Sequence, residues 1–149
     1  MIDKIRKAMA EGSADYIEVR VQKTSSTVVQ YSGHELEGIG RSNHLGGSVR
    51  AMTKGGWGFA SFNEVEELPR FVKAACEQAR LVKRESPGLA PVEPAKDTVI
   101  ATPKVDPRNV PLEQKQALCE AYNKIILKHD KIQSSNVAYR DSTTDEYMV

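Results

Sequence analysis

The sequence predicts an α+β fold in which an antiparallel β-meander of hairpins packs against helices. Apolar and polar residues alternate over residues 17–22, a pattern typical of a half-buried strand. Glycine-containing turns separate this segment from further β-rich segments that reach residue 62. An apolar stripe with a period of about 3.6 residues follows at 65–82 and indicates a helix packed on the sheet.

A short amphipathic helix is predicted to precede the strands. Ile2, Ile5 and Met9 recur at helical spacing before Gly12, which is expected to stop the helix. The first strand is then predicted to run from residue 15 to residue 31, because its β-branched residues continue the extended pattern up to a Ser-Gly turn.

The next segments predict a second, weaker strand over residues 34–44 and a third over residues 45–53. The Lys54-Gly55-Gly56 tripeptide tolerates positive φ and predicts a tight hairpin turn into a fourth strand at 57–62. The single tryptophan, Trp57, lies in that strand. Because tryptophan buries a large apolar area, it is expected to anchor the sheet against a helix.

The strongest helix prediction begins at a capping box, Asn63 to Glu66, and extends to Lys83. Pro69 falls in the first turn, where proline is tolerated. The predicted buried stripe comprises Val65, Leu68, Val72, Ala75, Ala79 and Val82, widened by Phe71 and Cys76.

Prolines interrupt the chain between Arg84 and Pro111, so a helix cannot persist there. This segment predicts an extended connector with a short strand at Thr98–Ala101. Pro111 is expected to start a second helix that runs to about Lys128. Its predicted apolar stripe comprises Leu118, Ala121, Tyr122 and Ile125, with Cys119 and Ile126 at the edges.

The C-terminal part predicts two strands, at 132–141 and 143–149, around a polar turn from Asp141 to Asp145. The last strand pattern stops at Val149 without a polar tail, so we expect the chain to be the front part of a longer protein. The predicted organisation is a first domain at 1–84, a Pro-rich connector at 85–110 and the truncated start of a second domain at 111–149.

Composition narrows the class of partner and the compartment. The chain has 21 basic and 20 acidic residues, so its net charge of +1 gives no sign of nucleic-acid binding. It has no secretory signal pattern and no apolar run of the ~20 residues that a membrane span needs. Cys76 and Cys119 lie on predicted apolar helix faces, which indicates buried free thiols and a reducing compartment. We therefore expect a cytoplasmic protein.

No motif predicts a catalytic or metal site in this chain. His34-Glu35 begins like the zinc-protease pattern HExxH, but glycine replaces the second histidine and the segment follows a turn in a predicted strand. His44 and His129 have no partners at ligand spacing. Glu35 and Glu37 share a strand face, which is typical of solvated surface residues as well as of acid–base pairs. We therefore predict no catalytic residue and no metal-binding residue in this chain, and we assign no substrate-binding residue.

The segments ADYIEVRVQKTSST, SGHELEGIGRS and GGSVRAMTKGGWGFASFN stand in this order before an alanine-rich helix. This order resembles the N-terminal domain of the TldD/PmbA family, long called modulators of DNA gyrase. The resemblance covers residues 14 to about 83. The matching residues are Ala14, Asp15, Tyr16, Glu18, Val19, Arg20, Gly33, Leu36, Glu37, Gly46, Arg50, Gly56, Trp57, Gly58, Phe59, Ala60 and Ser61.

The resemblance implies a cytoplasmic protein much longer than this chain, with residues 111–149 opening the family's middle domain. It implies that a TldD-like subunit is a zinc metallopeptidase whose His-Glu-x-x-x-His helix lies in a later domain. A PmbA-like subunit, also called TldE, lacks that site and pairs with it to cut unstructured peptides, including microcin precursors and an antitoxin. His34-Glu35 does not match that motif and inherits no role from it.

The expected function is a non-catalytic module that serves as scaffold, as contact to a second family subunit in a homo- or heterodimer, and as a guide for peptide access. No cofactor is expected in this chain, and zinc is implied only for a TldD-like complete protein. An extended peptide is expected to add to a free edge of the first strand at 19–29. The alternatives are the front end of the non-catalytic PmbA/TldE-like partner, a non-enzymatic binding module that contacts gyrase, and an unrelated α+β domain.

Overall fold

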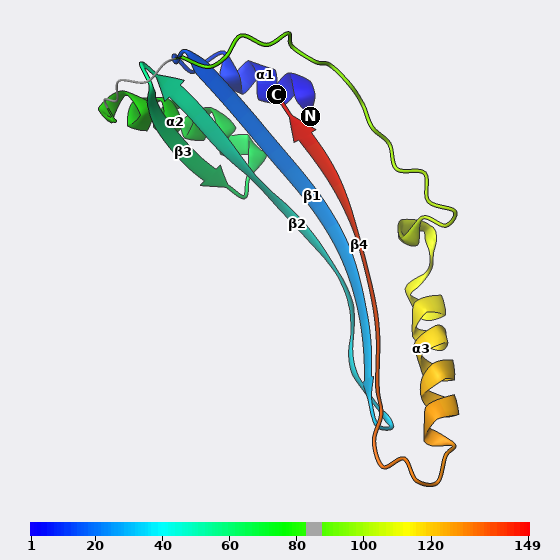
Figure 1. Cartoon of the computed structure of the whole chain (residues 1–149). Helices are drawn as coiled ribbons and strands as arrows, with labels where there is room; N and C mark the ends of the chain where they lie inside the picture. The colour runs from blue at the N-terminus through cyan, green and yellow to red at the C-terminus, as the bar shows by residue number, and fades with distance from the viewer. Residues whose placement is uncertain (83–87) are drawn as a thin grey trace. The chain divides into compact units, whose positions relative to one another are not determined.

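The computed structural model describes residues 1–82 and 88–149. It confirms the predicted α+β class, with a four-stranded sheet in the order β3-β2-β1-β4 (Figure 1). The elements in chain order are α1 (Ile2–Met9), β1 (Tyr16–Ser32), β2 (Glu35–Thr53), β3 (Gly56–Phe62), the 3-10 helix η1 (Val65–Glu67), α2 (Leu68–Leu81), the 3-10 helix η2 (Pro107–Asn109), α3 (Leu112–Leu127) and β4 (Asn136–Met148).

The chain forms two compact units that interleave along the sequence, and each contains part of β1, β2 and β4. Unit 1 comprises residues 1–23, 44–97 and 145–149, and unit 2 comprises residues 24–43 and 98–144. The predicted domain limits at 84/85 and 110/111 stay predictions. The first limit lies outside the described residues, as do Lys83, the predicted helix end, and Pro87.

The core of unit 1 lies between one face of its sheet segments and helices α1 and α2. Val19 and Val21 of β1 and Val49 of β2 are fully buried there, together with Ile5 of α1 and Val72 of α2. Each such side chain contributes roughly 1.5–3 kcal/mol relative to an exposed one. The alternation of apolar residues along β1 therefore predicted the buried face of the strand correctly.

Helix α2 follows the predicted stripe over most of its length, since Leu68, Val72, Ala75, Cys76 and Ala79 are buried. Pro69 lies in its first turn, as predicted.

Two details of that helix prediction were wrong. Val82 is 51% exposed, because the helix ends at Leu81. The capping box does not form, because η1 precedes α2 and neither begins with a side-chain cap hydrogen bond. The carboxylate of Glu66 instead accepts a hydrogen bond from Lys4 Nζ at 2.6 Å.

The predicted hairpin between β2 and β3 is confirmed. Thr53 pairs with Gly56, so the turn has the two central residues Lys54 and Gly55. Their φ angles are 49° and 78°, as a two-residue turn of the primed type requires. The carboxylate of Asp15 accepts a hydrogen bond from the Lys54 amide at 2.7 Å and fixes the turn from outside.

The role predicted for Trp57 was wrong, because glycine rather than tryptophan faces the helix. A Cβ atom at Gly58 would lie 1.9 Å from the carbonyl oxygen of Ala75, and one at Gly56 would lie 1.8 Å from that of Val82. The backbone of β3 therefore packs directly on α2. Trp57 alternates to the opposite face of the sheet and remains 38% exposed.

Two predicted breaks in the strands do not exist. His44 was expected to end a strand, but β2 continues from Glu35 to Thr53, and the predicted polar turn at 141–145 is part of β4. Polar side chains pair across the strands at these places, with Ser25 donating to Asn43 at 2.6 Å. The predicted short strand at 98–101 is not formed.

Helix α3 in unit 2 turns a different face inward from the one predicted. Its buried residues are Lys115, Cys119 and Asn123. The predicted apolar stripe is largely exposed, with exposed fractions of 45% for Leu118, 56% for Tyr122 and 65% for Ile125. Pro111 is the N-cap of the helix rather than its first residue.

Strand β1 has neighbours on both sides, so its backbone is not available to an added strand. The expectation that a peptide pairs with residues 19–29 was therefore wrong. The outer strands are β3 and β4. On β3, the amide of Phe59 donates to the side chain of Gln78 on α2 at 3.2 Å, which satisfies one edge donor.

Candidate functional site

Several of the residues that carry the sequence resemblance form an aromatic surface on unit 1, which we call the outer face. It lies on the side of the sheet opposite α1 and α2. The guanidinium of Arg50 lies 4.9 Å from the ring centroid of Trp57, and the ring of Tyr16 meets Trp57 edge-on at 6.0 Å. Phe59, which pairs with Arg50 across the strands, is 56% exposed. Exposed Trp, Phe and Arg side chains are typical of protein contact surfaces.

The polar groups of the outer face hold one another in place. Tyr16 donates its hydroxyl hydrogen to Glu18 at 2.9 Å, and Arg50 lies 3.8 Å from the same carboxylate. Burial, together with the Glu18 carboxylate, raises the pKa of Tyr16 above its ordinary value of 10.0. The phenol is therefore held in its protonated form as a donor, which suits a structural role better than base catalysis.

The structure does not bring the histidines and carboxylates considered in the sequence together into a metal site. His34 lies in the turn between β1 and β2, and Glu35 begins β2. Glu37 accepts a hydrogen bond from Gln30 at 3.1 Å, as a surface residue does. The ring of His129 accepts one from its own loop. Within residues 1–82 and 88–149, no group of three or more His, Cys, Asp or Glu side chains is placed to hold a metal.

Both cysteines are buried and free, as predicted. Cys76 belongs to the core of unit 1, and Cys119 packs with Val29 and Tyr31 in the core of unit 2. Burial raises the pKa of the Cys119 thiol above its ordinary value of 9.0. A thiol held protonated in this way is a poor nucleophile.

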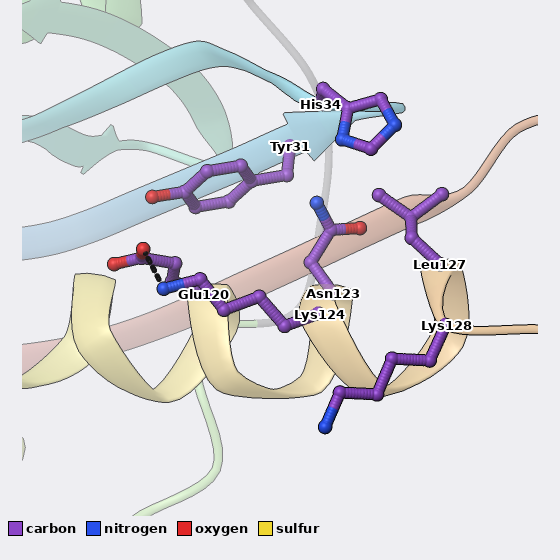
Figure 2. A pocket seen from close by; sticks show the side chains of 7 residues that line it. All are labelled: Tyr31, His34, Glu120, Asn123, Lys124, Leu127 and Lys128. Atoms are coloured by element: carbon purple, nitrogen blue, oxygen red, sulfur yellow. Dashed lines mark ion pairs between the residues drawn. The ribbon is translucent and has the colours of Figure 1, made fainter.

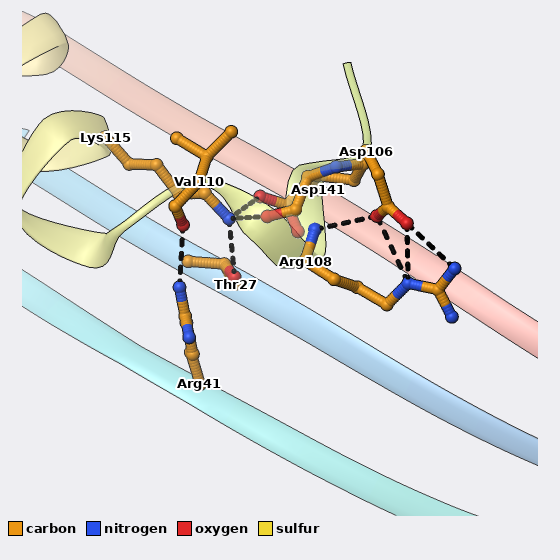
Figure 3. Close-up of polar contacts among 8 residues, drawn as sticks. Thr27, Arg41, Asp106, Arg108, Val110, Lys115 and Asp141 are labelled. Atoms are coloured by element: carbon orange, nitrogen blue, oxygen red, sulfur yellow. Dashed lines mark hydrogen bonds and ion pairs between the residues drawn. The ribbon is translucent and has the colours of Figure 1, made fainter. Parts of the chain in front are cut away.

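Unit 2 contains a buried cation, Lys115 of α3, whose side chain is 2% exposed. Its Nζ donates to the Asp141 carboxylate at 2.7 Å, to the Pro107 carbonyl at 2.8 Å and to the Thr27 hydroxyl at 3.2 Å (Figure 3). Nζ also lies 5.6 Å from the ring centroid of Tyr139. All three ammonium hydrogens are thus used, which is what burial of a charge requires.

The carboxylate of Asp141 responds to this environment. Burial by itself raises the pKa of the group, but hydrogen bonds from Lys115 and Tyr139 outweigh it and hold the pKa below the ordinary value of 3.8. Nearby, the side chain of Arg108 donates to both oxygens of Asp106 and lowers the pKa of that carboxyl. Both carboxylates are therefore charged at neutral pH and each has its own cation.

One cavity in unit 2, of about 350 Å³, lies between α3 and the end of β1 (Figure 2). Tyr31 of β1 and His34 of the turn after it line one side of the cavity, and Asn123 of α3 lines the other. Asn123 donates to the Gly33 carbonyl at 2.7 Å and accepts from Ser135 at 2.6 Å, so its amide is committed to fixing the turn. These bonds favour a structural role for this cavity.

Another cavity in unit 2, of about 260 Å³, has many hydroxyl, amide and guanidinium side chains among its lining residues, and we call it the hydroxyl cavity. It lies beside the Lys115 network, and Thr27 and Asp141 belong to both. Its lining residues are Ser25, Ser26, Thr27, Arg41, Ser42, Asn43, Pro107, Arg108, Asp141 and Thr143. They come from β1, β2, η2 and β4, so segments far apart in the sequence build it.

Sequence reasoning missed both the network and the hydroxyl cavity. A lysine within a helix is usually solvated, and Asp141 was assigned to a turn. One signal was available, because Lys115, Cys119 and Asn123 recur at a spacing of four residues and so share a helix face. In the same way, Val137, Tyr139 and Asp141 are two residues apart along β4 and so share a face of the strand.

Comparison with known proteins identifies the family. Residues 17–79 match the sequence profile described as PmbA/TldA metallopeptidase domain 1. Residues 17–79 therefore carry the first domain of the PmbA/TldD family. The matched segment contains β2, β3, most of α2 and all of β1 except Tyr16, so it includes the strands that carry most of the aromatic outer face. The family predicted from the sequence motifs is thus confirmed.

Two curated relatives are named as metalloproteases. The chain is 37% identical over 135 residues to Metalloprotease slr0863 of Synechocystis sp., covering 89% of this chain and 29% of that protein. It is 27% identical over 146 residues to Metalloprotease MJ0996 of Methanocaldococcus jannaschii, covering 94% of this chain and 32% of that protein. The chain therefore spans about a third of the length of these two relatives.

Solved structures show the same fold. A candidate DNA gyrase modulator from Bacteroides thetaiotaomicron matches with a TM-score of 0.77 at 21% identity, covering 99% of this chain and 36% of that one. TldE from Thermococcus kodakarensis matches with a TM-score of 0.64 at 15% identity, covering 98% and 34%. At these identities the likeness concerns the fold.

Among the helices that the structure describes, none is long and apolar enough to span a membrane.

Proposed function

We propose that this chain is the non-catalytic first module of a PmbA/TldD-family metallopeptidase that cuts unstructured peptides in the cytoplasm. In this proposal the module serves as scaffold, contacts a second family subunit and shapes the access of peptide to a zinc site that lies outside it. The names of the curated relatives support a peptidase.

The observation that carries the contact role is the exposed apolar face of α3, formed by Leu118, Tyr122 and Ile125. These residues are 45–65% exposed and follow one another at spacings of four and three. Leaving three large apolar side chains in water gives up roughly 1.5–3 kcal/mol for each one that a partner would bury. An apolar centre with charged neighbours, here Lys124 and Lys128, is the usual composition of a subunit interface.

The experiment is a chimera in which residues 1–149 replace the matching segment of the Synechocystis metalloprotease. We expect the chimera to form a dimer whose mass is measured by light scattering after size exclusion. Replacing Leu118 and Tyr122 with glutamate places two charges in the apolar centre and is expected to yield folded monomers. The matched control replaces Val99 and Ile100 of the connector with glutamate. These two residues are 89% and 75% exposed, and we expect the dimer to stay intact.

Dimers that persist with Leu118→Glu and Tyr122→Glu would contradict the contact role of α3. Loss of folding without release of folded monomers would place the face against another part of the same chain, and so would also contradict a subunit contact. Circular dichroism of the separated monomer distinguishes these results.

A further inference from the structure

We propose that the hydroxyl cavity of unit 2 is a binding site for the carboxylate group of a small ligand, with Arg41 as its charge partner. The site is formed by residues of unit 2 alone. It is independent of the proposed peptidase function, because it rests on the groups that line the cavity.

The charge balance of the cavity leaves one positive charge without a partner. Lys115 neutralises Asp141 at 2.7 Å, and Arg108 neutralises Asp106 at 2.8 Å. Arg41 remains, and in the part of the chain that the structure describes no carboxylate forms an ion pair with it. The cavity therefore offers one net positive charge, which a monoanionic carboxylate balances and a phosphate dianion exceeds.

The guanidinium of Arg41 is oriented but not saturated. Its Nη2 donates to the carbonyl oxygen of Val110 at 2.8 Å, which ties the side chain across unit 2 (Figure 3). The remaining N–H donors of the guanidinium have no acceptor among the described contacts. A fork of parallel N–H donors is the geometry that binds a carboxylate through both oxygens.

Asn43 supplies a second donor on the same side of β2, since residues two apart in a strand share a face. The hydroxyl of Ser25 donates to Oδ1 of Asn43 at 2.6 Å, so the amide oxygen is occupied. The amide Nδ2 group is thereby left as the donor that a ligand oxygen can reach. Serine hydroxyls complete the lining and provide further hydrogen-bonding groups.

The floor of the cavity is preorganised. Thr27 is 5% exposed and its hydroxyl is fixed by Lys115, which is itself held by three acceptors. A site whose groups are already in place loses little conformational entropy on binding. The volume of about 260 Å³ admits a small organic acid but not a folded partner.

The test is an NMR titration of the 149-residue chain with N-acetylglycine, using N-acetylglycinamide as the neutral control and inorganic phosphate as the competing oxyanion. We expect saturable amide shifts at residues 25–27 and 41–43 with N-acetylglycine and none with the amide. Arg41→Gln removes the charged hydrogen bonds and is expected to weaken binding about tenfold. Arg6→Gln, an exposed arginine of α1 in unit 1, leaves binding unchanged.

Three results overturn the proposal. These are equal shifts with N-acetylglycine and its amide, wild-type binding by Arg41→Gln, and no saturable shift at millimolar ligand. Tighter binding of phosphate than of N-acetylglycine overturns the assignment to a carboxylate. Asn43→Ala provides a second variant, expected to weaken binding without changing the charge, in case Arg41→Gln alters the fold.

Discussion

Replacing Gly58 with alanine is expected to lower the free energy of unfolding by about 3 kcal/mol. The new Cβ would lie 1.9 Å from the Ala75 carbonyl oxygen and 2.6 Å from the Ala79 amide nitrogen. These are backbone atoms of α2, so the helix itself must move away from β3 and lose packing over the core. Thermal unfolding followed by circular dichroism measures the effect, with an expected fall in Tm of about 10 °C.

The matched control is Gly38→Ala, in the part of β2 that belongs to unit 2. A Cβ atom there meets nothing within 4 Å, and the residue does not have a positive φ. We expect no loss of stability, since alanine restricts the unfolded chain more than glycine does. Equal Tm values for Gly58→Ala and Gly38→Ala would show that α2 does not pack on β3 as closely as described.

Replacing Lys115 with methionine is expected to destabilise unit 2 by about 3 kcal/mol. The change leaves the carboxylate of Asp141, whose side chain is only 16% exposed, without its cation. Hydrogen exchange is the appropriate measurement, because the loss concerns unit 2. The amides of α3 should exchange faster while those of α2 keep their protection.

The pH dependence of stability provides a second test of the Lys115→Met variant. In the native chain the pKa of Asp141 lies below its ordinary 3.8, so the stability from this carboxylate is present above that pH and is lost as pH falls through the native pKa. Without Lys115, burial raises the pKa of Asp141. Protonation of this carboxyl then removes the buried, unpaired charge from the variant. The difference in stability between native and variant is therefore expected to shrink as pH falls from the raised pKa of the variant through the lowered pKa of the native chain.

Lys124→Met controls for loss of a helical lysine. Lys124 is exposed and pairs with Glu120 on the surface, so no measurable change is expected. A Lys115→Met variant as stable and as protected as Lys124→Met would contradict the buried network.

Local patterns predicted the parts of the fold where apolar burial decides the structure. In α2 the stripe from Leu68 to Ala79 packs on a sheet in the same unit, so the helical period alone located its buried face. The turn at Lys54-Gly55 followed from the positive φ that both residues adopt. In each of these places one contribution to the free energy of folding, apolar burial in α2 and backbone conformation in the turn, outweighs the other contributions.

Local patterns failed where close backbone packing or polar contacts decide the structure. Trp57 was expected to anchor a helix, but the glycines beside it allow α2 to approach the strand, and alternation then turns the indole outward. In α3 the polar contacts of Lys115 and Asn123 select the inner face, and the apolar stripe is exposed. An amphipathic pattern locates an apolar face but does not show what covers it.

The central claim is that this chain is a non-catalytic module. It is tested most directly by incubating the purified 149-residue chain with stoichiometric Zn²⁺ and an unstructured peptide and following cleavage by mass spectrometry. We expect no cleavage beyond that of the peptide alone, in the wild type and in His34→Ala alike. Zinc-dependent cleavage that rises with the concentration of the chain and disappears in His34→Ala would contradict it.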